Sequence, residues 1–136
     1  MAMLWLVALF AFLIGVIIYL ANTGNLGFAY WVYDFPHGDK VAHVILLGLV
    51  TLPASLGMLH LLSGDAARIV LRAAGAIGAL ITLEEVSQAF LPRRSLDPYD
   101  LAASYMGIAG AALLAYTLRG IMRQEVSVRD PEAAVE

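Results

Sequence analysis

Residues 101–121 read LAASYMGIAGAALLAYTLRGI and contain a single charged residue, Arg119. A helix of this length crosses the ~30 Å hydrocarbon core of a bilayer, because each residue adds ~1.5 Å along the axis. Three further stretches have the same character, namely residues 3–21, 41–62 and 69–90. None of them alternates polar and apolar residues, as a membrane strand would. The sequence therefore predicts an all-α fold, a polytopic membrane bundle of four transmembrane helices.

The overall composition agrees with a membrane environment. Of the 136 residues, 61% are hydrophobic and only 14% are charged, whereas soluble domains are about 25% charged. The net charge of −3 provides no basic field, so nucleic acid is not an expected partner. The absence of cysteine excludes disulfides, thiolate nucleophiles and cysteine zinc sites. No cofactor is expected.

The segments between the spans carry their own signals. Residues 28–35 read FAYWVYDF, are too short to span, and predict a short interfacial aromatic segment at the headgroup level. Asp39 is expected to cap the second helix, and Asp97, followed by Pro98, the fourth. Residues 1–122 are predicted to form the transmembrane domain and residues 123–136 a polar, frayed C-terminal tail.

The cationic residues indicate the orientation of the chain. One side of the predicted spans would carry Arg68, Arg72, Arg119, Arg123 and Arg129, and the other Lys40, Arg93 and Arg94. Because cytoplasmic segments carry an excess of Lys and Arg, both termini are expected in the cytoplasm. The three cations of the other side lie beside carboxylates and histidine, which suggests a ligand.

Polar residues within the spans gather at one membrane face. That face is shared by the start of the second helix, the end of the third and the start of the fourth. The residues come in pairs at helical spacing: Lys40 with His43, Glu85 with Gln88, and Asp100 with Ser104. Each pair projects from one side of its helix. On the fourth helix, small residues such as Gly107 continue the same side and allow close backbone approach. The polar ends are therefore expected to converge.

In this order and spacing the residues resemble the VanZ-like membrane proteins. The resemblance covers residues 39–110 and rests on Asp39-Lys40-x-x-His43, Glu85-x-x-Gln88, Pro92-x-Arg94, and Asp100 with Gly107 and Gly110. The chain differs at Ser104, where the family usually has asparagine, and at Arg93, where glycine is common. The resemblance implies a VanZ-like domain and a multi-pass protein of the bacterial inner (cytoplasmic) membrane. The family's namesake is associated with low-level teicoplanin resistance, and the resemblance supplies no established reaction.

Ionisable groups inside a span need a reason, because each costs about 2.5–3.5 kcal/mol at mid-membrane. We interpret His43, which can exchange protons near neutral pH, and Glu85 as candidate catalytic residues. The candidate substrate-binding residues are Asp39, Lys40, Gln88, Arg94, Asp100 and Ser104. The arginine offers a planar fork to phosphate oxygens, and the lysine a point charge.

Structural interpretations stay open for several of these residues. One of Glu84 and Glu85 can extend to water while the other pairs with Lys40 or Arg94. His43 can be a satisfied core histidine, and the aspartates can be caps, Asp97 above all. No metal site is expected, because one histidine with scattered carboxylates lacks a recognisable spacing. A serine nucleophile is disfavoured, since nothing in the sequence pairs one with His43.

Three functions compete at this point. The first is a membrane protein that binds a lipid-linked phosphate or amphiphile at the outer leaflet, with catalysis left open. Its partners would be membrane lipids, anionic or isoprenoid-linked, and it is compatible with an oligomer. The second is a non-catalytic scaffold of the envelope, in which ion pairs fix helix order and a surface recruits a partner. The third is a small proton-coupled carrier.

Overall fold

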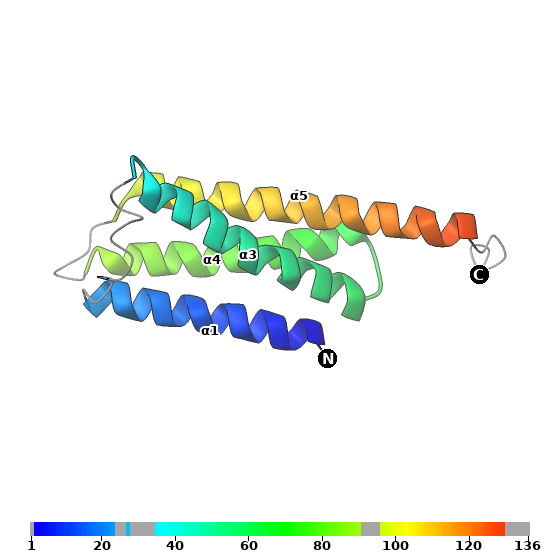
Figure 1. The fold of residues 1–136 in the computed structure, drawn as a ribbon, viewed down its shortest axis with the longest axis horizontal. Coiled ribbons are helices and arrows are strands. Elements are labelled where there is room, and N and C mark those ends of the chain that lie inside the picture. Colours follow the sequence, from blue (N-terminus) through cyan, green and yellow to red (C-terminus); the bar gives the residue numbers. More distant parts are fainter. Residues whose placement is uncertain (1, 24–26, 28–34, 91–95, 130–136) are drawn as a thin grey trace.

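The computed structural model describes residues 2–23, 27, 35–90 and 96–129. The helices in these ranges are α1 (Ala2–Thr23), α3 (Gly38–Leu61), α4 (Ala66–Gln88) and α5 (Pro98–Arg129) (Figure 1). The described ranges contain no strand, which confirms the all-α prediction. Of the predicted aromatic segment, all residues but Phe35 lie outside the described part of the chain.

Three of these helices are long and apolar enough to cross a membrane. They are α3, α4 and the part of α5 from Pro98 to Gln124. Large apolar side chains such as Leu80 and Leu113 point outward, whereas Ser104 is completely buried. This distribution is stable in lipid, because apolar side chains face the hydrocarbon and polar side chains have partners inside the protein. The structure therefore supports a membrane protein.

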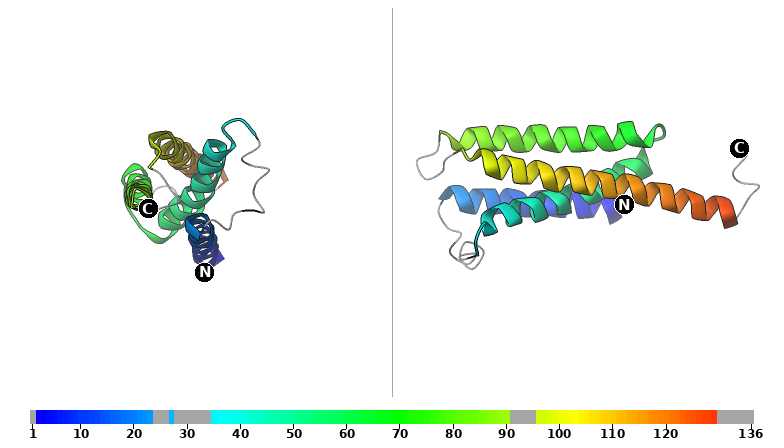
Figure 2. Two further views of the ribbon diagram at one scale, coloured as in Figure 1. Left: turned by 90° about the vertical axis from the view of Figure 1, so that its left-hand side faces the viewer. Right: turned by 90° about the horizontal axis from the view of Figure 1, so that it is seen from above.

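Helices that follow one another in the chain run in opposite directions, so α3 and α5 run parallel to each other (Figure 1). The starts of α3 and α5 and the end of α4 lie together at what we call the site end, and the start of α1 and the end of α5 lie at the opposite, terminal end (Figure 1). Helix α3 packs against α1, α4 and α5, which places it at the centre of the arrangement (Figure 2). The start of α3, the end of α4 and the start of α5, which the sequence predicted to share one membrane face, thus lie at one end of the structure.

The core between α3, α4 and α5 consists of two apolar clusters. Leu47, Ile81 and Ile108 form the first, each about one helical turn from the polar residues of the site end. The second lies nearer the terminal end and is formed by Leu59, Ile69 and Val70.

Small residues bring the backbones of α3 and α5 close together. A Cβ atom at Gly107 would collide with the carbonyl oxygen of Val44 on α3. A Cβ atom at Gly48 would lie 3.6 Å from the carbonyl oxygen of Gly107. The close approach expected from the small residues of α5 is confirmed.

The helix starts agree only in part with the sequence. Asp97 does cap α5, because its Oδ1 accepts a 2.8 Å hydrogen bond from the N–H of Tyr99. The prediction that Asp39 caps the second helix is wrong. That helix begins at Gly38, its N-cap is His37 in a left-handed conformation (φ 60°), and no side chain caps it. Asp39 lies in the first turn, where its charge still favours the helix dipole and its carboxylate is free to bind Lys40.

Helix α5 continues past the expected end at residue 121 and reaches Arg129. Residues 122–129 read MRQEVSVR and contain neither glycine nor proline, so nothing in them breaks a helix. The first part of the predicted frayed tail is therefore helical.

Candidate polar site

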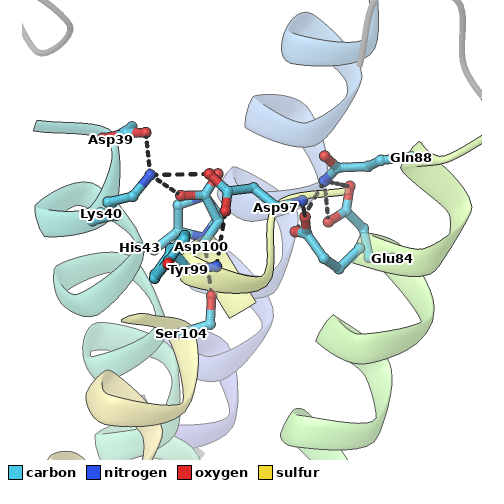
Figure 3. Close-up of polar contacts among 10 residues, drawn as sticks. Asp39, Lys40, His43, Glu84, Gln88, Asp97, Tyr99, Asp100 and Ser104 are labelled. Carbon is cyan, nitrogen blue, oxygen red and sulfur yellow. Dashed lines mark hydrogen bonds and ion pairs between the residues drawn. The ribbon is translucent and has the colours of Figure 1, made fainter. Parts of the chain in front are cut away.

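Three carboxylates surround the ammonium of Lys40 at the site end. Its Nζ lies 2.8 Å from Asp39 Oδ2, 3.1 Å from Asp97 Oδ2 and 2.8 Å from Asp100 Oδ1 (Figure 3). An ammonium has three hydrogens to donate, and here each has a carboxylate acceptor. We call these four residues the Lys40 cluster, which ties the first turn of α3 to the start of α5.

Asp97 serves two helices at once. Its carboxylate caps α5 through the N–H of Tyr99 and also binds Lys40, and these two interactions hold its pKa below the usual value. Its own backbone N–H donates a 3.0 Å hydrogen bond to Glu85 Oε1 on α4. The interpretation of Asp97 as a cap alone is therefore incomplete. This residue links α3, α4 and α5.

His43 lies one helical turn below Lys40 and faces α5. Its Nδ1 lies 2.9 Å from Ser104 Oγ, and its Nε2 lies 3.9 Å from Asp100 Oδ2 (Figure 3). The second distance is too long for a hydrogen bond, so Asp100 lies beside the ring without bonding to it. The structure thus supplies the serine partner for His43 that no sequence spacing indicates. Because Ser104 is 0% exposed, an external electrophile has no direct access to this hydroxyl.

Glu85 is the buried carboxyl group of the site, with only 1% of its surface exposed. Besides the Asp97 N–H, it accepts a 3.4 Å hydrogen bond from Gln88 Nε2. The same amide donates to both carboxylate oxygens of Glu84, at 3.0 and 2.8 Å. Gln88, itself 2% exposed, therefore holds the two glutamates together. Among the described residues Glu85 thus binds Gln88 and the Asp97 N–H, and not Lys40, one of the two ion pairs that the sequence left open.

These contacts unite almost all of the predicted site residues. We use the name polar site for Asp39, Lys40, His43, Glu84, Glu85, Gln88, Asp97, Asp100 and Ser104. Arg94, the remaining candidate, lies outside the described residues, as does its neighbour Arg93. His60 is near the end of α3 that is remote from the site, as expected from its position in that helix.

The ionisable side chains of the described polar site are predominantly acidic. It contains five carboxyl groups and the single ammonium of Lys40. An anionic ligand therefore needs cations other than Lys40, whose hydrogens are already donated. Arg93 and Arg94, in the connector between α4 and α5, are the nearest ones in the sequence.

Three carboxylates of the Lys40 cluster also have the chemistry of a site for a hard cation. One oxygen each of Asp39, Asp97 and Asp100 lies within 4.8 Å of the others, and carboxylate oxygens suit Ca²⁺ and Mg²⁺. Lys40 Nζ is within 3.1 Å of all three, however, and supplies the positive charge there. A metal ion would have to displace it.

Two buried hydroxyls deeper in α3 were not indicated by the sequence. Thr51 and Ser55 are both 0% exposed, and their oxygens have no hydrogen-bond partner among the described residues. They lie one helical turn apart on either side of Pro53. Serine and threonine are ordinary in membrane helices, so the sequence carries no signal for their burial depth.

The polar site thus brings carboxyl groups, an ammonium and an imidazole from three helices close together. Comparison of the chain with protein-family models, with curated proteins and with solved structures found no match.

Proposed function

We propose that the chain is an integral protein of the bacterial cell envelope whose polar site binds a lipid-linked phosphate or a related amphiphile. The observation that carries the proposal is the convergence of polar side chains from α3, α4 and α5 at one end of three apolar helices. Charged groups at that depth are costly and gather where a membrane protein has a task. The resemblance to the VanZ-like family supports the same assignment, including its link to teicoplanin resistance.

In the proposed arrangement α1 is a fourth transmembrane helix of the bundle. It is a 22-residue helix without a charged residue, and it packs against α3. The terminal end holds more cations than the site end, which favours both termini in the cytoplasm and the polar site at the outer leaflet of the inner membrane.

The geometry divides the roles among the residues. Arg94, with Arg93, is proposed to bind the anionic head, because Lys40 is already bound by three carboxylates. Lys40 instead fixes Asp100 beside His43. His43, which is partly exposed, exchanges a proton with the ligand, and Glu85 with Gln88 orients it. Whether the protein also breaks a bond in the ligand is tested by measuring turnover. His43→Ala and Glu85→Gln are the diagnostic variants, because turnover should be lost in both if these residues are catalytic.

The decisive experiment is mass spectrometry of the lipids that copurify with the protein. An anionic, lipid-linked phosphate is expected with the wild type, and its loss is expected in Arg94→Ala. Arg72→Ala is the matched control, because it removes one arginine from α4 near the terminal end. Equal lipid profiles for the wild type and Arg94→Ala would refute head binding at the polar site.

One observation favours a second candidate, the structural scaffold. All three hydrogens of Lys40 are committed to carboxylates, as expected of a lock that fixes helix order. The exchange Lys40→Asp with Asp100→Lys tests it, since these two side chains face each other. If the ion pairs only fix helix order, the double variant should recover both the melting temperature and partner binding. If they form a ligand site, it should recover the melting temperature alone.

The carrier is less well supported by the packing. A proton or solute path needs polar groups through the membrane, but Leu47, Ile81 and Ile108 form a buried apolar layer directly below the polar site. Vesicle flux measurements with the wild type should accordingly show no proton movement.

A further inference from the structure

A long groove runs between α4 and α5, away from the polar site. It has a volume of about 520 Å³, within the ~300–1,000 Å³ typical of small-molecule sites. Its floor is formed largely by small residues, among them Ala67, Ala74, Gly75, Ala109 and Ala112. Such a surface has little to offer a polar ligand, and it is open to the lipid side of two candidate membrane spans.

Tyr105 closes this groove toward the site end. Its hydroxyl donates a 3.2 Å hydrogen bond to the carbonyl oxygen of Gly78 and lies 2.9 Å from Thr82 Oγ1. The ring packs directly over Gly78, where a Cβ atom would lie only 2.9 Å from Tyr105 Cε1. The tyrosine thus bridges α5 and α4, and the groove is separate from the polar site.

The other end of the groove leads to positive charge. Tyr116 is its last lining residue on α5, and Arg119 and Arg123 follow three and seven positions later, on the same side of the helix. Helix α5 extends beyond the start of α4 here (Figure 1). Neither guanidinium forms an ion pair with a residue that the structure describes.

The dimensions fit one lipid leaflet. From Tyr105 to Tyr116 the helix rises about 17 Å at ~1.5 Å per residue, close to half of the ~30 Å hydrocarbon core. An acyl chain that begins at the terminal membrane surface would therefore end near Tyr105. Its phosphate would lie at the level of the two arginines, whose planar forks suit phosphate oxygens.

We propose that the groove between α4 and α5 binds an acyl chain of an anionic phospholipid from the leaflet at the terminal end, with its phosphate bound by Arg119 and Arg123. The apolar lining selects the chain and the arginines select the charge of the head. This site is distinct from the polar site and does not depend on the function proposed there.

The first test fills the groove. Gly75→Leu places a side chain in open space, because no atom lies within 4 Å of its Cβ position. Gly110→Leu is the matched control, since its Cβ position is equally open and it does not line the groove. Native mass spectrometry with added phosphatidylglycerol should show the lipid retained by the wild type and Gly110→Leu, and lost by Gly75→Leu. Retention by Gly75→Leu would overturn the proposal, and so would a wild-type dimer that this variant alone dissociates, since a second copy would then occupy the groove.

The second test addresses the charge. Arg119→Gln and Arg123→Gln should each weaken phosphatidylglycerol binding about fivefold, as expected for one cation near a membrane surface, and leave phosphatidylcholine binding unchanged. Arg72→Gln controls for general charge, because Arg72 lies near the same end but outside the groove. Equal weakening by Arg72→Gln would contradict a specific head site. A copurified phosphatidylglycerol that survives Arg94→Ala but not Gly75→Leu would separate this site from the polar site.

Discussion

The Nζ atom of Lys40 lies 2.8 Å from Asp100 Oδ1 and joins two residues that are 60 positions apart in the sequence. The same ammonium binds Asp39 and Asp97. One side chain thus holds the first turn of α3 against the start of α5. The role proposed for His43 depends on this arrangement, because Asp100 Oδ2 lies 3.9 Å from His43 Nε2.

Replacing Lys40 should convert the cluster into a cation site. In Lys40→Met three carboxylates whose oxygens lie within 4.8 Å of each other lose their common counter-charge, so the melting temperature should fall. Millimolar Ca²⁺ should restore it in the variant and leave the wild type unchanged, because Lys40 excludes the ion there. Arg72→Met is the control for loss of a cation elsewhere. A variant that melts like the wild type and ignores Ca²⁺ would contradict the role assigned to Lys40.

Glu85 should tolerate loss of charge better than loss of its acceptor oxygens. Glu85→Gln retains an oxygen that can accept from the Asp97 N–H, so only a small change in the free energy of unfolding is expected. Glu85→Leu leaves this partly buried donor without its acceptor and should cost about 1–3 kcal/mol. Thermal or denaturant unfolding in detergent measures both. Equal losses of stability in the two variants would show that the negative charge, and not the acceptor oxygen, stabilises the fold.

The contact between α3 and α5 predicts a position-specific effect of glycine substitution. Gly107→Ala forces a methyl group against the carbonyl oxygen of Val44 and should destabilise the protein by about 1–3 kcal/mol. Gly110→Ala meets no atom within 4 Å and should be neutral or stabilising by up to about 1 kcal/mol, since alanine favours a helix. Unfolding curves of the two variants provide the comparison, and similar values for both would exclude close backbone contact.

The Asp97 interactions predict a loss of stability in acid. The pKa of Asp97 is lowered from its usual value of 3.8 by the Tyr99 N–H and by Lys40. A carboxyl group with a lowered folded-state pKa stabilises the protein above its unfolded-state pKa, and this contribution is lost as the pH falls through the lowered value. The wild type should therefore melt above Asp97→Asn at pH 7, and the difference should shrink below about pH 4.

Asp65→Asn is the control for this experiment. Asp65 caps α4 through the N–H of Arg68, so both variants alter a helix cap, but only Asp97 is bound to Lys40. A difference between the wild type and Asp97→Asn that is the same at pH 7 and pH 3 would contradict the charge-based role.

The sequence was sufficient for the elements and for the composition of most of the site. Long uncharged stretches indicate helices because a bilayer leaves few other options, and the pair Glu85 and Gln88 follows from helical spacing alone. The contact of His43 with Ser104 does not follow from spacing, because it joins residues 61 positions apart. It depends on the axial position of α3 relative to α5. The link from Asp97 to Glu85 is hidden in the same way, since it uses a backbone N–H that no residue type reveals.

The double attachment of Asp97 has a mechanical consequence. Its carboxylate is bonded to Lys40 on α3, and its backbone N–H is bonded to Glu85 on α4. Asp97 is also the N-cap of α5. A ligand bound by the residues just before Asp97 would therefore act on three helices through this one residue. Ligand binding at the membrane surface would therefore alter the surroundings of the His43 imidazole without a large rearrangement of the helices.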